Sequence, residues 1–229
     1  MKIDHISDHI WSLKTWMIIP IHVWIVVEED GVTLVDAGLP LMAKGILKFI
    51  EQLNAGPLKR IVLTHGHSDH IGAIKRILKV KTVPVFAHRI EIPYMEGDYP
   101  YPNKKKAVAT IEKNFIHAFS EDENKNLQTL GSLTPYFTPG HSPGHVTFYH
   151  HDDRVLLAGD LFTSKKGKLH KPMPLFTADM NQAVKSSRIV TQLKPERLEV
   201  CHGKSVFFPA DQLEEYYKEH FVRQKDAFL

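Results

Sequence analysis

Cysteine is almost absent from this sequence of 229 residues: Cys201 is the only one, so no disulfide bond can form within the chain. A single thiol fits a reducing compartment. Long apolar runs are also missing, because no stretch approaches the length of a membrane-spanning helix. The opening MKIDHISDHI lacks the apolar core of a signal peptide. We therefore expect a cytoplasmic protein with no membrane partner.

The sequence also lacks a strong excess of either charge, since 29 Lys and Arg residues face 26 Asp and Glu residues, for a net charge of +3. This excess is too small to indicate a nucleic-acid partner by itself, and we expect a small-molecule substrate instead. Nothing in the sequence indicates the oligomeric state. With 43% hydrophobic residues the chain can bury a full core. We predict one domain over 1–229; two small halves that share a core are the alternative.

Histidine, by contrast, occurs 15 times, and its clustering is informative. The stretch THGHSDH at 64–70 follows an apolar run at 61–63, and helical spacing of apolar residues begins near Asp69. The cluster therefore lies where a predicted strand ends and a helix begins. A polar surface turn would explain this composition, but so many metal-binding groups at such close spacing favour a metal site.

Apolar patterns place the secondary structure coarsely. Strands are predicted at 22–27, 32–36, 61–63, 83–87, 133–137, 146–149, 155–158 and 197–200. The Asp-Gly pair that ends the turn 28–31 predicts a hairpin between the first two strands. Helices are predicted over 42–53, from about 69 to 78, and over 178–193 and 210–224. Strands thus fall into two groups, each followed by helices.

Residues 91–131 differ from the rest in composition. The stretch EIPYMEGDYPYPNKKK is rich in proline and tyrosine, and 107–119 has the pattern of a short amphipathic helix. We interpret the segment as an inserted lid, with an ordinary long surface connection as the alternative. Tyr94, Met95, Tyr99 and Tyr101 would then form an apolar wall over the site.

Candidate metal ligands follow four predicted strands, in positions where a rigid scaffold presents chemistry. They are His65, His67, Asp69 and His70 after the strand at 61–63, His141 after 133–137, Asp160 after 155–158 and His202 after 197–200. Imidazole and carboxylate donors suit Zn²⁺, Mn²⁺ or Fe, and seven donors exceed the needs of one tetrahedral ion. We therefore expect two metal ions that share a bridging ligand. Cys201 is expected to be a small buried thiol rather than a ligand.

The HGHSDH motif resembles the H-x-H-x-D-H signature of the metallo-β-lactamase superfamily. LVDAG, TPGHSPGH, AGD and CHG occur in the order typical of that superfamily and extend the similarity over nearly the whole chain. The resemblance implies an α/β fold, a four-layer αββα sandwich, with two Zn²⁺ ions per chain (Mn²⁺ or Fe as alternatives). It assigns His65, His67 and His141 to one metal, Asp69, His70 and His202 to the other, and Asp160 to the bridge. It also implies that Asp36 supports a ligand from behind, whereas His145 has either a supporting or a packing role.

This resemblance implies a metal-dependent hydrolase that attacks an ester, lactone or thioester carbonyl with a bridging hydroxide, with Asp69 as the catalytic proton carrier. True β-lactamases of the superfamily lack an aspartate at the position of Asp160. The chain is similar to N-acyl-homoserine lactonases and glyoxalase II-like thioesterases, but Thr163 stands where the lactonases have tyrosine. A lysine run at 165–171 would either hold glutathione or form a solvated loop. An iron-dependent sulfur dioxygenase with one metal ion and a phosphodiesterase are the alternatives.

Overall fold

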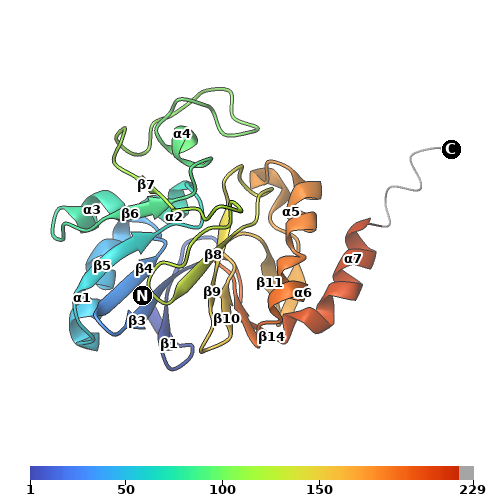
Figure 1. Ribbon diagram of the computed structural model, residues 1–229, viewed down its shortest axis with the longest axis horizontal. Coiled ribbons are helices and arrows are strands. Elements are labelled where there is room, and N and C mark those ends of the chain that lie inside the picture. The colour runs from blue at the N-terminus through green and yellow to red at the C-terminus, as the bar shows by residue number, and fades with distance from the viewer. Residues whose placement is uncertain (222–229) are drawn as a thin grey trace.

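Two β-sheets pack face to face, and helices cover the outer face of each sheet (Figure 1). The structure is a computed structural model that describes residues 1–221. One outer layer contains α1 (Ala43–Leu53) and α3 (Ile74–Leu78), and the other contains α5 (Met180–Ser186), α6 (Ile189–Leu193) and α7 (Leu213–Phe221). The αββα prediction is therefore confirmed.

The first sheet has seven strands in chain order. They are β1 (Lys2–His5), β2 (Ile10–Trp16), β3 (Pro20–Glu28), β4 (Gly31–Val35), β5 (Leu58–Val62), β6 (Val85–Ala87) and β7 (His117–Ala118). Neighbours are antiparallel up to β4 and parallel from β4 to β7. Because parallel strands need crossover connections, the chain passes through helices and long loops between them. The hairpin between β3 and β4 is the one that the Asp-Gly pair predicts.

The second sheet has the order β14-β13-β10-β9-β8. Its strands are β8 (Leu133–Phe137), β9 (Val146–His150), β10 (Val155–Leu157), β13 (Arg197–Glu199) and β14 (Val206–Phe207), and a separate hairpin joins β11 (Thr163–Lys165) to β12 (Lys168–His170). The remaining short helices are η1 (Pro40–Met42), α2 (Ser68–Ile71), α4 (Ile92–Met95), η2 (Pro174–Phe176) and η3 (Pro209–Gln212).

Strand β10 shows how the sheets separate two apolar cores. Val155 and Leu157 belong to the core between the sheets, whereas Leu156 belongs to the core beneath the helices of the second outer layer. Side chains alternate between the faces of a strand, so one apolar run supplies both cores. All three residues are buried, which holds the strand, and the loop that follows it, in a fixed position.

The predicted helix over 107–119 is wrong. In its place lie turns, followed by strand β7. The backbone N–H groups of Thr110 and Ile111 donate to the carbonyl oxygen of Met95 at 2.9 and 3.3 Å, and the buried side chains of Ile111 and Ile116 pack into the main core. The apolar spacing therefore reflects tertiary packing rather than one face of a helix.

Two other predicted helices are interrupted. The helix over 178–193 splits into α5 and α6 at Ser187, whose hydroxyl donates to the Val184 carbonyl at 2.6 Å. The helix from about 69 to 78 splits into α2 and α3 near Gly72, where an added Cβ would lie 2.8 Å from the Gly38 carbonyl oxygen. The last predicted helix is observed as η3 and α7, and residues 222–224 of that prediction lie outside the described residues.

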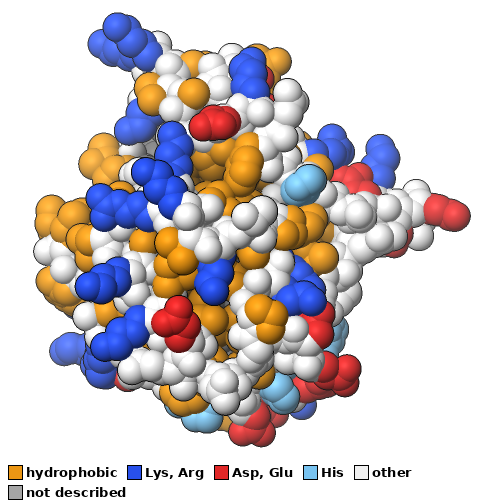
Figure 2. All heavy atoms as spheres, turned by 90° about the vertical axis from the view of Figure 1, so that its left-hand side faces the viewer, with side chains coloured by type: hydrophobic (Ala, Val, Ile, Leu, Met, Phe, Trp, Pro, Cys, Tyr) orange, Lys and Arg blue, Asp and Glu red, His pale blue; other side chains and the backbone are white. Residues whose placement is uncertain are grey.

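The face that carries α1 and α3 displays exposed hydrophobic side chains in its central area, surrounded by lysine and arginine side chains (Figure 2). A hollow of about 300 Å³ on this side is lined by α3 and residues 111–115. Within residues 1–221, no helix combines the length and the apolar character that crossing a bilayer requires.

Candidate metal centre

Seven donor residues meet where the loops after β5, β8, β10 and β13 come together. His65 and His67 follow β5, Asp69 and His70 lie in α2, His141 lies between β8 and β9, Asp160 follows β10, and His202 follows β13. Their donor atoms form overlapping groups in which the atoms of each group lie within 4.8 Å of one another. The structure therefore brings together every residue that the sequence analysis named as a metal ligand.

One group consists of three imidazoles. His67 Nδ1 lies 2.9 Å from His65 Nε2 and 3.0 Å from His141 Nε2. His65 and His141 are buried, and His67 lines a cavity. Three ring nitrogens that point at a common position form the kind of donor set that binds zinc and other transition metals.

The second group contains one carboxylate and two imidazoles. Asp69 Oδ2 lies 3.2 Å from His202 Nε2 and 3.9 Å from His70 Nε2. Cys201 is buried, as expected, and its thiol donates to the His22 carbonyl oxygen at 3.7 Å. Its Sγ nevertheless lies within 4.8 Å of donor atoms of the other three residues of the group.

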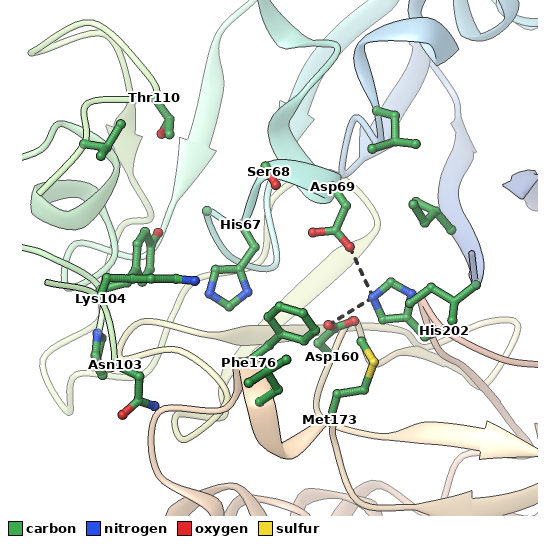
Figure 3. A pocket seen from close by; sticks show the side chains of 18 of the residues that line it. His67, Ser68, Asp69, Asn103, Lys104, Thr110, Asp160, Met173, Phe176 and His202 are labelled. Atoms are coloured by element: carbon green, nitrogen blue, oxygen red, sulfur yellow. Dashed lines mark ion pairs between the residues drawn. The ribbon is translucent and has the colours of Figure 1, made fainter. Parts of the chain in front are cut away.

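Asp160 lies between the two groups. Its Oδ2 is 3.3 Å from His141 Nε2 in the first group and 3.3 Å from His202 Nε2 in the second, and its Oδ1 is 3.5 Å from His70 Nε2. Figure 3 shows the carboxylates of Asp69 and Asp160 facing the same nitrogen of the His202 ring. A carboxylate in this position can contribute one oxygen to each of two ions.

The remaining ring nitrogens of four histidines are held by neighbouring groups. His70 Nδ1 lies 2.7 Å from Asp36 Oδ2, and His202 Nδ1 lies 2.9 Å from the Pro20 carbonyl oxygen. Thr64 Oγ1 contacts His65 Nδ1 at 3.1 Å, and Thr177 Oγ1 contacts His141 Nδ1 at 3.2 Å. These contacts fix the ring orientations, so that Nε2 of each ring faces the centre.

Asp36 is fully buried immediately beyond β4, with a left-handed backbone conformation (φ 57°). Its Oδ1 accepts the Thr64 N–H at 2.8 Å, and its Oδ2 accepts the Thr64 hydroxyl at 2.8 Å as well as facing His70. A non-glycine residue in this conformation is uncommon and persists where its surroundings determine it. Asp36 has the supporting position that the sequence analysis inferred.

His145 supports the site from the other sheet. Its Nδ1 contacts Thr138 Oγ1 at 3.0 Å, and its Nε2 accepts the backbone N–H of Asp160 at 3.2 Å. Burial lowers the pKa of His145 to about 3, so the ring is neutral and can accept that hydrogen bond. Of the two roles left open by the sequence, the supporting one is observed.

Glu91 is a functional candidate that the sequence analysis did not identify. It is fully buried, and its carboxylate accepts the Gly66 N–H at 2.9 Å, the Gly144 N–H at 2.7 Å and the Ser142 hydroxyl at 2.9 Å. Gly66 lies between two of the histidine donors, and Ser142 follows a third. One carboxylate therefore joins both histidine loops. No local pattern marks it, because its partners are distant in the sequence.

The protonation states of His65, His67, His141 and Asp69 suit cation binding. Neighbouring anionic groups raise the pKa of His70 and His202 despite their burial, so a cation would displace a proton from these two rings. Burial lowers the pKa of His65 and His141 well below the usual value and that of His67 to about 4, so these rings are neutral near pH 7. Burial opposes ionisation of Asp69, but the nearby rings of His70 and His202 outweigh it and lower the Asp69 pKa to about 2. Neutral imidazole and ionised carboxylate are the forms that bind a metal.

A further observation indicates that these residues are suited to bind metal ions. His70 Nε2, His202 Nε2 and Asp160 Oδ1 are buried and have no hydrogen-bond partner. A buried polar atom without a partner is costly, and native proteins rarely retain one without a reason. These atoms converge, and all belong to side chains that bind transition metals, so ligation of cations accounts for the arrangement.

A cavity of about 860 Å³ opens over the donor residues, and His67, Asp69, Asp160 and His202 contribute to its lining (Figure 3). Further walls come from three segments, which are residues 17–19 between β2 and β3 with Ile21 at the start of β3, residues 101–110, and residues 173–176 around η2. A large cavity with many apolar side chains and a few convergent polar groups is typical of a small-molecule site.

The expected apolar wall is only partly observed. Of the four residues named for it, Tyr101 lines the cavity and contacts the His67 ring at a centroid distance of 5.1 Å. Met95 is buried, Tyr94 packs against Tyr101, and Tyr99 is exposed. The lysines at 165–171 are not among the lining residues, whereas Lys104, Lys105 and Lys106 are. Sequence analysis did not assign a role to these three.

Comparisons with known proteins agree with this geometry. The sequence profile of the metallo-β-lactamase superfamily matches residues 18–202. A Bacillus subtilis (strain 168) protein with the name "Probable metallo-hydrolase YybB" is 37% identical over 99% of this chain and 100% of its own length. "Hydroxyacylglutathione hydrolase GloC" of Haemophilus influenzae is 26% identical over 63% of this chain and 68% of its own length.

Among solved structures, a metallo-β-lactamase from Erythrobacter litoralis, with beta mercaptoethanol in its active site, is similar with a TM-score of 0.72. It is 19% identical, and the match covers 95% of this chain and 96% of the other, so this similarity concerns the fold alone. The match to the superfamily profile extends from the β2–β3 turn to His202, the last of the donors. The chain belongs to the metallo-β-lactamase superfamily.

Proposed function

We propose that the protein is a hydrolase with two metal ions, zinc by preference, that cleaves an ester, lactone or thioester of a small molecule. The arrangement that supports this proposal is the position of Asp160 between two donor groups at the base of a large cavity. His65, His67 and His141 would hold one ion, and Asp69, His70 and His202 would hold the other.

When bound, the two ions would lower the pKa of a water molecule toward neutrality and polarise the substrate's carbonyl oxygen. The protein residues would hold the ions and the substrate in place, and Asp69 would carry the proton. In the overall step, the oxygen of water bonds to the carbonyl carbon, and the bond from that carbon to the leaving oxygen or sulfur breaks. The proton that water loses passes by way of Asp69 to the leaving atom.

Asp69 is suited to this role by its exposure. Its side chain is 27% exposed and lines the cavity, whereas the Asp160 side chain is 4% exposed. Figure 3 shows the Asp69 carboxylate on the cavity side of the centre. A proton carrier must reach both water and the leaving group, and only the more accessible of these two carboxylates meets that requirement.

Within this class, the similarity to a protein named hydroxyacylglutathione hydrolase favours a thioester. Thr163 gives no support to the lactone assignment, because its hydroxyl donates to the Lys171 carbonyl at 2.9 Å and the residue does not line the cavity. The ester and lactone nevertheless share the same reacting carbonyl, so all three belong in one substrate panel.

The test combines metal analysis of the purified protein with a panel of esters, lactones, thioesters and phosphodiesters. We expect two zinc ions per chain, loss of activity on chelation, and recovery with added zinc on carbonyl substrates. One iron per chain together with oxidation of a persulfide would replace the proposal with a sulfur dioxygenase. Turnover of the phosphodiesters alone would replace it with a phosphodiesterase.

A further inference from the structure

Three consecutive lysines, Lys104, Lys105 and Lys106, lie along one wall of the active-site cavity. None of them forms an ion pair with a carboxylate among residues 1–221. The side chain of Lys104 extends toward the His67 ring (Figure 3), and it is close enough to contribute to the lowered pKa of that histidine. Unpaired ammonium groups at a cavity attract anions to it.

The backbone that carries these lysines is fixed. The Lys104 N–H donates to the Tyr101 carbonyl at 2.9 Å, and the Tyr101 hydroxyl donates to Glu91 at 2.8 Å. The Asn103 side chain donates to the Thr177 carbonyl at 3.3 Å, which connects this wall to the segment around η2. The backbone of this wall is thus ordered beside the reaction centre before any substrate binds, while the lysine side chains stay exposed to solvent.

The other walls of the cavity carry exposed apolar side chains instead of charged ones. Ile18 is 81% exposed and Leu175 is 79% exposed, although both are large hydrophobic residues that line the cavity. Met17 and Phe176 are also exposed lining residues of these walls. Several exposed apolar side chains around one cavity indicate a binding site for an apolar group of a ligand.

From these two walls, and resting on the function proposed above, we infer that the substrate is an anionic amphiphile: an acyl ester or thioester with an apolar chain and a carboxylate, phosphate or sulfonate near the reacting carbonyl. The apolar chain lies against residues 17–19 and 175–176. The anionic group lies against the lysines at 104–106. Because Lys104 extends toward His67, we expect the anionic group to lie close to the bond that is cleaved, on the leaving group of the substrate.

The first test uses two chromogenic esters that differ only in charge. One is the octanoyl ester of hydroxynitrobenzoic acid, whose leaving group carries a carboxylate, and the other has this carboxylate masked as a methyl ester. The zinc-loaded enzyme should prefer the anionic ester by roughly tenfold in kcat/KM, as expected for several partly exposed charge contacts. Added salt should reduce this preference, because salt screens exposed charges.

A triple variant with Lys104→Gln, Lys105→Gln and Lys106→Gln should lose the preference, because its kcat/KM should fall much more on the anionic ester than on the methyl ester. The matched control changes Lys165→Gln, Lys166→Gln and Lys168→Gln, which removes the same charge from the β11–β12 hairpin away from the cavity lining. The control should retain the preference. Equal rates on the two esters in the wild type, or equal losses in both triple variants, would overturn the assignment of the lysines.

The second test concerns the apolar wall. From acetyl to octanoyl esters, kcat/KM should rise by up to about fourfold per added methylene, and Leu175→Ser with Phe176→Ser should flatten this dependence. A flat wild-type series would overturn the apolar part of the inference.

A binding measurement distinguishes failure of this inference from failure of the proposed function. Calorimetry with the zinc-loaded protein should show that octanesulfonate binds more tightly than octanol. If carbonyl esters are hydrolysed without a charge preference, the function stands and the substrate class falls. If no ester is hydrolysed but octanesulfonate binds through the lysines, the function falls and the anionic site stands.

Discussion

The Tyr101 hydroxyl donates a hydrogen bond of 2.8 Å to Glu91 Oε1, the same oxygen that accepts the Gly66 N–H at 2.9 Å. Gly66 separates two histidine donors, and Tyr101 lines the cavity. A single oxygen atom of Glu91 therefore connects the cavity wall to a metal-binding loop. The other oxygen accepts from Ser142 and Gly144 in the second histidine loop.

This arrangement predicts that Glu91→Gln weakens metal binding. Glutamine has one oxygen, and its amide N–H groups would face donors that now meet a carboxylate. Loss of such a supporting contact typically costs 10- to 100-fold in metal affinity, and we expect about that decrease in competition with a chromogenic chelator. Tyr101→Phe removes only one hydrogen bond and should change KM while zinc affinity stays constant. Equal zinc affinity in Glu91→Gln and wild type would contradict the supporting role.

A second prediction concerns Asp36, which orients His70 through a contact of 2.7 Å. Asp36→Ala should reduce the affinity for the second zinc ion by roughly 10- to 100-fold and leave the first ion bound. The same change leaves the Thr64 N–H unpaired in a buried position, so the apoprotein should lose about 1–3 kcal/mol of stability. Zinc titration and urea unfolding of the apoprotein measure the two effects. Simultaneous loss of both ions would show that Asp36 holds the whole site together.

A third prediction separates metal binding from proton transfer at Asp69. Asp69→Asn keeps the shape and one oxygen donor but removes the charge and the titratable proton. The variant should bind its second zinc ion more weakly, and saturating zinc should not restore kcat. The remaining defect should be about 10²- to 10⁴-fold on poor leaving groups and smaller on nitrophenyl esters, which need little protonation to depart. Full recovery on both substrate types would show that Asp69 is only a ligand.

A fourth prediction concerns pH and an ion pair between His9 and Asp153, which are 2.7 Å apart where the loop after β1 meets the turn after β9. The hydrogen bond that His9 donates to Asp153 raises the pKa of His9 above 6.5. The stabilisation is therefore fully present below pH 6.5, the ordinary histidine value, and is lost as the pH rises through the raised pKa.

Because the His9 side chain is 45% exposed, the charged pair should contribute only about 0.5–1 kcal/mol. His9→Ala should thus be more destabilising near pH 6 than near pH 9, when urea unfolding is compared with wild type at the same metal concentration. A difference from wild type that does not change with pH would show that the contact works as a neutral hydrogen bond. His150 also lies close to Asp153, at 3.6 Å, and burial lowers its pKa, so it is less protonated than an ordinary histidine at the same pH.

The identity of the donors could be predicted from the sequence because it depends on local pattern. His65, His67, Asp69 and His70 lie within a few positions of one another, and the apolar runs before the donors define where strands end. The αββα layers follow from the resemblance to the superfamily, whereas periodicity indicates only two groups of strands, each followed by helices. The helix predicted over 107–119 is wrong for the opposite reason: its apolar residues are buried by contacts with Met95 and the main core, which periodicity does not reveal.

Tertiary structure alone decided how these residues work together. Asp160 becomes the link between two donor groups only because β10 lies beside β13 and β9, with both neighbours placing a histidine loop at the same edge. Glu91 acquires its position through hydrogen bonds to residues far along the chain, and Asn103, which precedes Lys104, contacts the distant Thr177. Residue type and local spacing determine what a side chain can bind. Which side chains share a cavity depends on packing between distant segments, and a one-dimensional pattern carries little of that information.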